Sequence, residues 1–516
     1  MAVRTPEIRA LSLTPWPVAA QSHTAKLRKT RSTTLWTPHS LSLCSRTCRV
    51  KRFGIYPPLS TLDDWVTFGA SEGSTPSDWI YLGKLGEFGR AWRVRFAVSD
   101  EKVIAVFGKR GQGKSFTLGV LLEALALEER DSEIASIEHD RAVLLIDPLN
   151  IFQWIDVPLT DQAAAHSQEL ATQVARAREW GLSGTAINAQ IFYPAGAGET
   201  VFRREAVEFR LGVSDFSLDE WATLFDLDIV RDLRGNLVAE LFEKVTRSGW
   251  TSSTHGRVEP PDVPEIGDYV ECIAEDADIN SGIYRDETIR AVTQRLRAIS
   301  GYAVFQGIGT SISDLLKPRV ITVVLVNGLP EGLRHVVVSV LARRIVSSRA
   351  AASAAQKDLM LTTTLSPQQR QQRESIVRGA PPKTWIVVDE AQDIIPAGRK
   401  TAATEAIIKV VKEGRNFGLS FVLTTQQPNA VDSRVLSQVE TFLVHKLVSR
   451  NDIDLVVENS KCPLPSDIRD AEATISIHDL VSSLDVGQVL LSDTYAARCA
   501  VVNIRARVGA HGGFEA

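Results

Sequence analysis

Apolar and polar positions follow two different periods along this chain, and their order predicts an α/β fold. Short, continuously apolar runs are typical of strands that are buried on both faces of a parallel sheet. Such runs occur at KVIAVF (102–107), AVLLIDP (142–148), VITVVLV (320–326), TWIVVD (384–389) and LSFVLTT (419–425). Between them, residues 114–129, 333–349 and about 401–415 repeat apolar residues with the 3.6-residue period of helices. We therefore expect a parallel sheet flanked by helices.

Three segments interrupt this alternation. Residues 54–100 contain short β-like pieces, WIYLGKLG and AWRVRFAV, and predict a small β-rich N-terminal lobe. Residues 205–300 are acidic with helical periodicity, which predicts a helical insertion outside the sheet. Residues 351–383 are polar and show no period, so we expect a flexible linker. The main domain spans 101–516, and short strands are expected to close it at 441–448, 487–493 and 499–508.

The composition is typical of a globular protein without a membrane span. Of 516 residues, 44% are apolar and 23% are charged, which is enough to bury a large core. The longest apolar runs stop well short of the roughly 20 residues that cross a bilayer. Five scattered cysteines suit a reducing cytoplasm better than a disulfide framework, and Cys44 and Cys48 lack a nearby second pair for zinc. We expect a cytoplasmic protein.

Charge is distributed unevenly between the first 53 residues and the rest. Residues 1–53 carry ten Lys or Arg and one acid, so a net charge of −4 for the chain leaves −13 for the remainder. Rich in Ser, Thr and Pro, this segment predicts a disordered basic arm; a leader, a DNA-binding arm and an over-extended translation start remain alternatives. Any nucleic-acid contact of the acidic body must be local.

A phosphate-binding loop is predicted between the first strand and the first helix. GKRGQGKS (108–115) fits the pattern GxxxxGK[ST], and glycines let consecutive backbone N–H groups surround a phosphate at the helix N-terminus. Lys114 adds a full positive charge, and the Ser115 hydroxyl can bind Mg²⁺. The predicted ATP-binding residues are Gly108, Gly111, Gln112, Gly113, Lys114, Ser115 and Phe116.

Two acidic residues end the strand TWIVVD and complete the predicted chemistry. Asp389 can hold Mg²⁺ through its water shell, and Glu390 can polarise an attacking water. By itself such a pair is also common in a solvated turn. Beside a phosphate-binding loop, it indicates hydrolysis of ATP rather than binding alone, because a base beside the metal ligand has no use where water must be excluded.

The stretch EGRNFGLSFVLTTQQP (413–428) carries polar residues at both ends of an apolar strand. The helix near 401–415 returns the chain to the edge opposite the phosphates, so Arg415 is poorly placed to reach its own ATP. Gln426 follows the strand to the ligand edge, near Glu390. We interpret Gln426 as a sensor of its own nucleotide and Arg415 as an arginine finger for a neighbouring subunit. Alternatively, Arg415 favours the helix dipole and Gln426 caps the strand.

These motifs, taken in order, make the chain resemble HerA-type ATPases of the HerA and FtsK group of RecA-like motors. The pieces that carry the resemblance are GKRGQGKSFTLGVLLEAL, LLIDP, ISDLLKPRVITVVLVNGLPEGLRHVVVSVLARRI, WIVVDEAQDIIP, EGRNFGLSFVLTTQQP, LSQVETFLVHKL and VGQVLLSD with IRARVGAHGG. They run from about residue 90 to the end. The resemblance implies a RecA-like fold, a hexameric ring and ATP-driven translocation of double-stranded DNA, often beside a nuclease or another effector. By position it implies the Walker A residues Lys114 and Ser115 and the Walker B residues Asp389 and Glu390.

Two positions depart from the family pattern. Asp147 begins DPLNIF where the family tends to show an Asp-Pro-His-Gly-Glu-Tyr-like turn, so Asp147 is either part of the site or a strand-end cap. Gln427 stands where an Arg is frequent. The expected function is DNA translocation or unwinding in DNA processing or anti-phage defence. A conjugation-type or secretion-type motor, and an ATP-gated scaffold that regulates an effector, remain alternatives.

Overall fold

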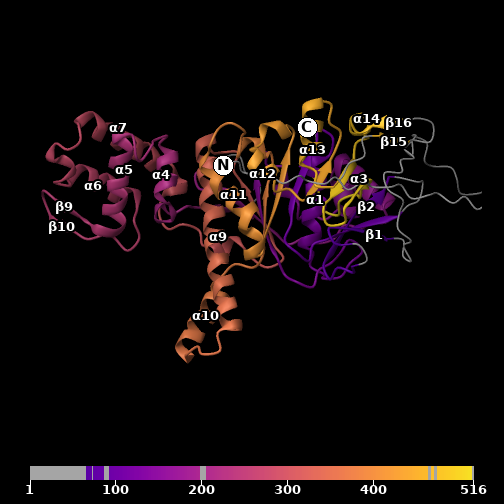
Figure 1. The fold of residues 1–516 in the computed structure, drawn as a ribbon, viewed down its shortest axis with the longest axis horizontal. Coiled ribbons are helices and arrows are strands. Elements are labelled where there is room, and N and C mark those ends of the chain that lie inside the picture. The colour runs from indigo at the N-terminus through magenta and orange to yellow at the C-terminus, as the bar shows by residue number, and fades with distance from the viewer. Residues whose placement is uncertain are drawn as a thin grey trace, which may run out of the picture. The chain divides into compact units, whose positions relative to one another are not determined.

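The structure is a computed structural model, and its chain divides into two units, Met1–Arg49 and Val50–Ala516. The first unit lies wholly outside the residues that the structure describes. The described residues are 65–71, 74–86, 92–197, 205–462, 467–469 and 474–513. The predicted basic arm (1–53) and the pair Cys44 and Cys48 therefore lie outside them. Figure 1 shows the fold of the chain and labels its elements.

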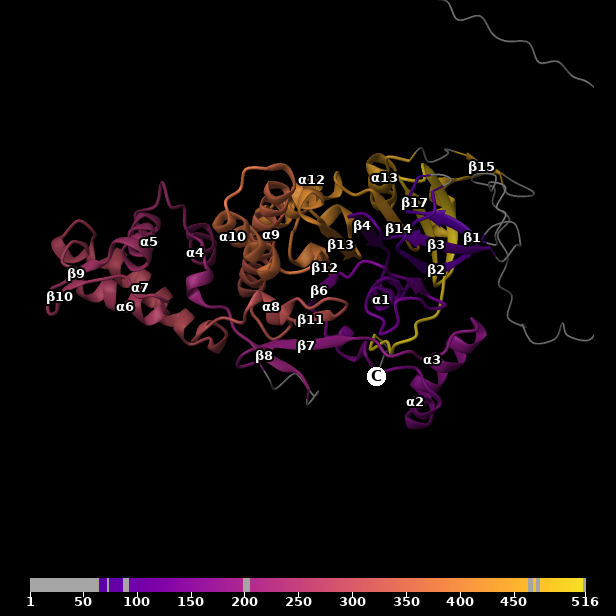
Figure 2. The same cartoon turned by 90° about the horizontal axis from the view of Figure 1, so that it is seen from below.

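One large mixed sheet organises the second unit (Figures 1 and 2). Its strand order is β1-β3-β2-β18-β17-β14-β4-β13-β12-β6-β11-β7-β8, and β5 pairs with β2. The strands on the main path are β1 (Trp65–Phe68), β2 (Trp79–Leu85), β3 (Arg93–Ala97), β4 (Val103–Phe107), β6 (Ala142–Asp147), β7 (Ala189–Pro194), β8 (Val207–Phe209), β11 (Ile321–Leu325), β12 (Thr384–Val388), β13 (Leu419–Thr425), β14 (Thr441–Val444), β17 (Gln488–Asp493) and β18 (Arg498–Ile504). The branch strand is β5 (Ala135–Ser136).

The strands from β14 to β8 are all parallel, which confirms the predicted fold class. The expected five buried strands lie within one residue of β4, β6, β11, β12 and β13. Because parallel strands end at the same edge of a sheet, the segments that follow β4, β12 and β13 lie together at one carboxyl edge. This edge brings the phosphate-binding loop, the acidic pair and Gln426 together.

The predicted small N-terminal lobe needs a correction. Its strands are present as β1, β2 and β3, but they extend the main sheet instead of forming a separate layer. β2 pairs antiparallel with β18, and β18 pairs antiparallel with β17. The reason is that the last strands of the chain, β17 and β18, bridge the parallel region to the first ones. Sequence separation hid this pairing, because no local pattern reports which distant strands are neighbours.

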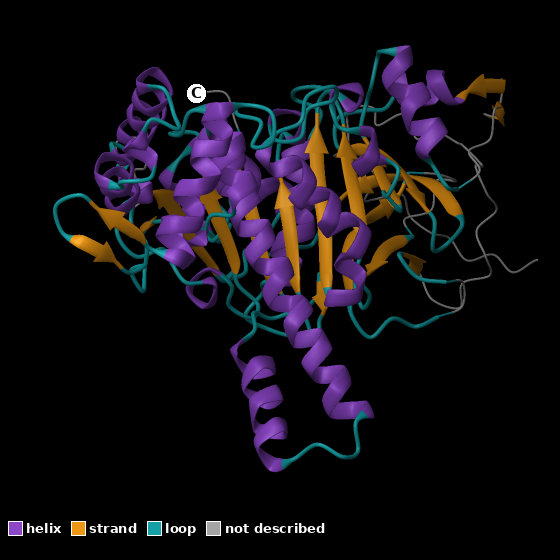
Figure 3. Ribbon diagram, turned by 60° about the vertical axis from the view of Figure 1, so that its left-hand side comes forward, coloured by secondary structure: helices purple, strands orange, loops and turns teal. Residues whose placement is uncertain are grey.

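Helices cover both faces of the sheet (Figure 3). Alternate residues of each buried strand face opposite cores: Ala105 and Phe107 of β4 lie in one core, and Ile104 and Val106 lie in the other. The first core includes residues of α9 (Glu331–Leu361) and α11 (Ala402–Glu413), and the second includes α1 (Lys114–Leu125) and α3 (Gln168–Glu179). Further helices outside 205–300 include α2 (Asp161–His166), α8 (Ile312–Leu315), α12 (Ser433–Leu436), α13 (Arg450–Asn459) and α14 (Ile477–Ser482).

The segment 205–300 is mostly helical in the structure. It holds α4 (Leu218–Leu224), α5 (Leu233–Glu243), α6 (Ile266–Glu275) and α7 (Asp286–Ser300), together with the hairpin of β9 (Trp250–Ser252) and β10 (Gly256–Val258). Buried Glu220 of α4 fixes this segment to α9, because it accepts hydrogen bonds from Ser339 at 2.9 Å and from Arg343 at 2.8 Å. The remaining short hairpin pairs β15 (Asp467–Arg469) with β16 (Thr474–Ser476).

The prediction of a flexible linker at 351–383 is wrong. α9 continues to Leu361, and α10 (Pro367–Gly379) runs back beside it as a helical hairpin that projects from the sheet (Figures 1 and 3). Ser366 and Gln369 form a capping box with Pro367 in the first turn, and Arg373 donates to Asp358 at 2.9 Å. The segment lacks apolar periodicity because most of this hairpin is exposed, while local helix propensity and capping still favour helix.

No helix among the described residues has the length and hydropathy needed to cross a bilayer.

Candidate functional site

The loop between β4 and α1 forms an anion-binding cradle at the carboxyl edge. Gly111 (φ 74°) and Gly113 (φ 102°) adopt left-handed conformations, and Gly113 caps the N-terminus of α1. Gly108 is required for a different reason, because a Cβ there would lie 2.6 Å from the Cβ of His445. Lys114 and Ser115 then begin the helix, where unpaired N–H groups and the helix dipole favour phosphate.

Lys114 is held between the loop and the carboxylates. Its side chain is almost fully buried, and its Nζ lies 3.5 Å from the carbonyl oxygen of Lys109. Burial lowers the pKa of Lys114, while the charges of Glu390 and Asp389 oppose that shift. An anion placed in the cradle would be held by this ammonium group and would reinforce its charge.

Asp389 is buried at the end of β12 in a position that fits a metal ion. Its Oδ1 accepts a short hydrogen bond from the hydroxyl of Thr424, but its buried Oδ2 has no partner among the described residues. Burial, and then the charge of Asp147, raise the pKa of Asp389 to about 7. A buried carboxylate oxygen without a donor is expected where a cation or its water shell binds, so Asp389 and Ser115 fit Mg²⁺.

Asp147 at the end of β6 caps a turn, and its charge also acts on Asp389. It accepts hydrogen bonds from the backbone N–H groups of Leu149 at 3.0 Å and Phe152 at 2.8 Å, so it caps the turn that follows the strand. It is also fully buried, which raises its pKa to about 6, and its charge acts on Asp389. This carboxylate therefore belongs to the electrostatics of the site while it stabilises the turn.

Glu390 is fixed by hydrogen bonds on both of its carboxylate oxygens. Gln426 Nε2 donates to its Oε1 at 2.6 Å, and Gln392 Nε2 donates to its Oε2 at 2.9 Å. Its backbone is left-handed (φ 48°), and its N–H donates to the hydroxyl of Thr424 at 3.1 Å. Thr425 donates to Gln392 at 2.7 Å and so orients the second amide. The strained backbone and the two amides fix the carboxylate within the cavity.

Gln426 and Arg415 lie at opposite edges of the sheet. Gln426 lines the cavity with Lys114 and Glu390, whereas Arg415 lies in the 3-10 turn Gly414–Phe417 before β13. The Arg415 side chain is exposed and makes no hydrogen bond or ion pair with any other described residue; its charge acts on Lys102 near the amino end of β4. Gln427 is exposed as well, and among the described residues only its backbone forms hydrogen bonds. Its N–H donates to the Thr425 hydroxyl at 3.0 Å, and its carbonyl oxygen accepts from the N–H of Ala430 at 2.9 Å.

A cavity of about 810 Å³ joins these residues to the C-terminal segment, a size typical of small-molecule sites. It is lined by Lys114, Ser115, Phe116, Glu390 and Gln426, and also by residues that sequence reasoning missed, among them Arg176, Gly487, His511 and Gly513. Gln112 lies in the cradle loop between Gly111 and Gly113 but is not among the lining residues.

An aromatic and cationic wall closes this cavity. Phe116 and His511 meet edge to face with ring centroids 5.6 Å apart, and Arg176 lies over Phe116 at 4.9 Å. Burial, followed by the charges of Arg507 and Arg176, lowers the pKa of His511 to about 3, so the ring is neutral. Buried Glu123 of α1 accepts hydrogen bonds from the backbone N–H groups of Val508 and Gly509, which places His511 beside the cradle.

Comparison with known proteins places this site in a family. The family model described as "Helicase HerA, central domain" matches residues 80–345, and the model described as "Zonular occludens toxin (Zot)" matches residues 319–456. The DNA double-strand break repair helicase HerA of Sulfolobus acidocaldarius is 29% identical over 105 residues, 20% of this chain and 19% of that protein. The probable DNA double-strand break repair helicase HerA of Methanocaldococcus jannaschii is 28% identical over 128 residues, 25% of this chain and 24% of that protein.

Among solved structures, the fold is similar to that of VirB4 of Thermoanaerobacter pseudethanolicus. That match has 15% identity and a TM-score of 0.45, and it covers 85% of this chain and 98% of that one. The matched segments of these curated HerA helicases span about a fifth to a quarter of their length. The central-domain model covers more than half of this chain. The chain therefore belongs to the helicase HerA central-domain family, and its fold and phosphate-binding loop are those of a HerA-type P-loop ATPase.

Proposed function

We propose that the protein is an ATP-hydrolysing ring motor that moves along double-stranded DNA. The observation that carries the proposal is the arrangement around Glu390. A carboxylate held by Gln426 and Gln392 shares one cavity with Lys114, and Asp389 is buried beside it. A base in fixed orientation beside a phosphate cradle suits the activation of water against a γ-phosphate.

The residues of this chain divide the work of hydrolysis. The backbone N–H groups of Gly111 to Ser115 and the Lys114 ammonium bind the phosphates of ATP. Ser115 and Asp389 would hold Mg²⁺, which neutralises charge on the transferring group. Glu390 orients the attacking water and accepts its proton, while the Gln426 amide reports whether a γ-phosphate is present.

In a ring, a neighbouring subunit can supply the arginine finger for each ATP site. Strand β13 lies between Arg415 and Gln426, and its seven residues span roughly 23 Å at about 3.3 Å per residue. Arg415 at the amino edge therefore cannot reach the γ-phosphate bound to its own chain, and it is exposed there for a neighbour. A head-to-tail contact that repeats this interface closes as a ring, in our proposal a hexamer.

Double-stranded DNA is the proposed cargo, because the curated relatives are described as double-strand break repair helicases. Exposed cations on the α9 and α10 hairpin, among them Lys357, Arg370 and Arg378, are the proposed DNA contacts. Binding through such contacts weakens steeply as salt increases. We place the motor in the cytoplasm, where its cysteine thiols stay reduced, with a nuclease or another effector as its partner in DNA processing or anti-phage defence.

The proposal is tested by ATPase activity with and without double-stranded DNA, together with a mass measurement in solution. Glu390→Gln should lower kcat by about 10² to 10⁴ while ATP still binds, since only the base is lost. Glu271→Gln, which alters an exposed carboxylate of α6, serves as the matched control and should behave as wild type. A monomer whose hydrolysis ignores DNA would contradict the motor and favour the ATP-gated scaffold; activity tied to membrane assembly would favour a secretion-type motor.

A further inference from the structure

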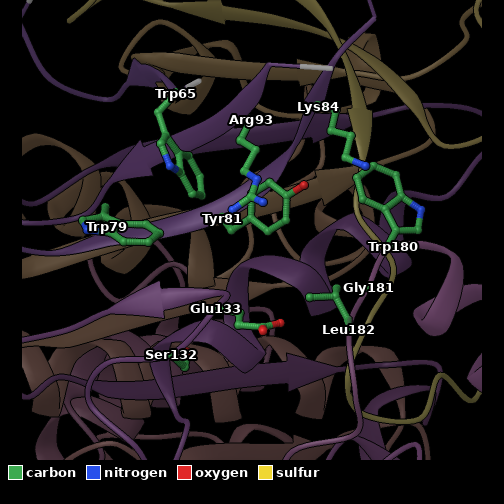
Figure 4. Close-up of a pocket in the computed structure, with 10 residues that line it drawn as sticks. All are labelled: Trp65, Trp79, Tyr81, Lys84, Arg93, Ser132, Glu133, Trp180, Gly181 and Leu182. Atoms are coloured by element: carbon green, nitrogen blue, oxygen red, sulfur yellow. The ribbon is translucent and has the colours of Figure 1, made fainter. Parts of the chain in front are cut away.

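A second cavity, of about 310 Å³, lies at the β1 end of the sheet and shares no lining residue with the ATP cavity. Figure 4 shows its lining, in which Trp65, Trp79, Tyr81 and Trp180 gather with Lys84 and Arg93. Most of these side chains come from β1, β2 and β3, and Trp180 directly follows α3. Aliphatic side chains alone could cover the end of the sheet, so four aromatic rings and two cations around one cavity suggest a ligand site.

Strand register places these side chains on one face. Trp65 of β1 stands beside Arg93 of β3, and Arg93 stands opposite Lys84 of β2. A bulge in β2 between Tyr81 and Gly83 shifts the register by one residue. Without that bulge, strict alternation from Tyr81 would direct Gly83 to this face in place of Lys84. The irregularity in the strand therefore brings a cation next to the rings.

The rings are arranged as a stacking surface with open faces. Trp65 lies 5.2 Å from Trp79 and 5.4 Å from Tyr81, both between centroids, and Tyr81 lies 6.5 Å from Trp180. Tyr81 is buried, whereas the three tryptophans are only partly covered. Tilted and edge-to-face contacts between the rings fix their orientation, and partial exposure leaves ring surface for a planar ligand.

The cations decide the charge of that ligand. Lys84 lies 4.8 Å from the centre of the Trp180 ring, and the guanidinium of Arg93 lies 5.4 Å from the centre of Trp65. Neither cation forms an ion pair with a carboxylate within the described part of the chain. A cationic ligand would meet repulsion here, because Lys84 and Arg93 already lie over one face of Trp180 and of Trp65. An anion that carries a planar group is the complementary partner.

From this combination we infer that the cavity binds single-stranded nucleic acid by stacking unpaired bases on Trp79 and Trp180 and pairing the phosphates with Arg93 and Lys84. Stacking platforms beside a basic track are the general means of holding single strands. A paired base is covered on both faces within a duplex and cannot stack here. Glu133 on the rim can accept a hydrogen bond from an exocyclic amino group of a base.

This cavity lies close to the ATP site along the chain. Arg176, which lines the ATP cavity, and Trp180 are four residues apart at the end of α3, about 6 Å along the helix axis. A strand stacked on Trp180 would therefore lie one helical turn from a residue at the nucleotide. The inference goes beyond the proposed function, since it assigns a single-stranded ligand and a site outside the duplex path.

The test measures binding of a fluorescently labelled 20-nucleotide oligo(dT) to the full-length protein by anisotropy, without ATP. Trp180→Ala and Trp79→Ala should each weaken binding by roughly 5-fold to 100-fold, and Trp180→Phe should recover most of the loss. Arg93→Glu changes an exposed side chain, should weaken binding and should reduce the salt dependence by about one phosphate contact. Tyr302→Ala, at an aromatic residue 39% exposed in another region, is the matched control.

Three results would overturn the inference. The first is unchanged oligonucleotide affinity in both tryptophan variants. The second is that a 20-base-pair duplex competes as well as unlabelled oligo(dT) and that its binding depends on Trp180. The third is that a poly-glutamate peptide binds this site in preference to the oligonucleotide, which would indicate an acidic protein partner. Lys114→Ala separates this inference from the proposed motor, because it should abolish ATP hydrolysis and leave oligonucleotide binding unchanged.

Discussion

The two ends of strand β13 present opposite environments to the polar residues that flank it. At the carboxyl end, Gln426 bonds to Glu390 at 2.6 Å inside a cavity that is also lined by buried Lys114. At the amino end, Arg415 extends into solvent and bonds to no described residue. At one end the polar residue is paired within its own chain, and at the other Arg415 has no partner in the part of the chain that the structure describes.

In our proposal, a single apolar strand serves two subunits. A residue that acts in its own site can be held by neighbours on adjacent strands, as Gln426 is held by Glu390. A residue that acts on another subunit must stay exposed until assembly, so it gains no such contacts. Exposure of Arg415 is therefore informative only in combination with its position at the edge opposite the phosphates.

The largest expected effect is that of Arg415→Ala, which tests the amino end. An arginine finger stabilises charge in the transition state of phosphoryl transfer, so its loss should lower kcat by about 10³ or more in the assembled protein. Mixing Arg415→Ala with Lys114→Ala subunits should restore part of the activity, because some mixed interfaces combine an intact cradle with an intact finger. Activity should be read as a function of the mixing ratio.

Lys412→Ala, which removes an exposed cation in the last turn of α11, should leave kcat unchanged and serves as the control for surface charge. If mixtures of the two inactive variants remain inactive at every ratio, while mass measurement shows that they assemble, Arg415 does not act in trans. The comparison of the two strand ends would then lose its functional meaning.

Gln426→Ala tests the carboxyl end and should have the second-largest effect. It removes the donor to Glu390 Oε1, so the base loses its orientation while the phosphate cradle stays intact. Loss of one well-placed donor near the reacting atoms typically lowers kcat by about 10². ATP affinity should stay the same in equilibrium binding.

The neighbouring variant Gln427→Ala should remain within about twofold of wild type in kcat, because the Gln427 side chain is exposed. Equal losses in the two variants would mean that the strand end acts as a structural cap and not as a sensor.

Much of this site could be predicted from the sequence because its parts follow strands directly. The cradle, Asp389, Glu390 and Gln426 each come within two residues of a buried apolar run, and parallel strands deliver such positions to one edge. The prediction of a flexible linker at 351–383 was wrong because this segment does not follow a buried strand. An exposed helical hairpin shows no apolar period, and its capping signals at Ser366 and Gln369 are local and weak.

Other residues were missed because their proximity depends on tertiary structure. Gln392, Thr424 and Thr425 orient the carboxylates, but their role appears only when β12 and β13 lie side by side. His511 is almost 400 residues from the cradle in sequence and reaches it through the bonds of Glu123. One signal in the sequence was available. The polar segments DEAQD (389–393) and TTQQ (424–427) each stand at the end of an expected strand, and this spacing could have indicated that Gln392 pairs with Thr425.

His445 supplies a pH-dependent test of the carboxyl edge. It lies behind the cradle, bonded to Thr117 at 2.9 Å, and burial lowers its pKa to about 3. The unfolded chain takes up this proton near pH 6.5 and the folded chain does not, so stability is present above pH 6.5 and is lost as pH falls towards 3. At pH 5 this histidine alone should reduce the free energy of unfolding by about 2 kcal/mol.

Urea unfolding at pH 7 and pH 5 should therefore show a smaller pH-dependent loss for His445→Gln than for wild type. Glutamine does not titrate in this range and can still bond to Thr117. The exposed His139→Gln serves as the control and should keep the wild-type difference. Identical pH dependence in wild type and His445→Gln would show that the cradle does not exclude a charge from this position.

The smallest expected effect separates binding from turnover within the carboxyl edge itself. Phe116 lines the ATP cavity and contacts His511 and Arg176, but it lies away from the carboxylate chemistry. Phe116→Ala should weaken ATP and ADP equally, by about 2-fold to 10-fold, since one aromatic contact contributes about 0.5–1.5 kcal/mol. Because the contact is equal in the ground and transition states, kcat at saturating ATP should not change.

Tyr495→Phe, which removes the 2.7 Å bond to Glu440 near the amino edge, is the control and should leave the affinities for ATP and ADP unchanged. A fall in kcat for Phe116→Ala would mean that Phe116, with His511 and Arg176, positions the γ-phosphate. Phe116 would then act on turnover, as Gln426 does, and not only on binding.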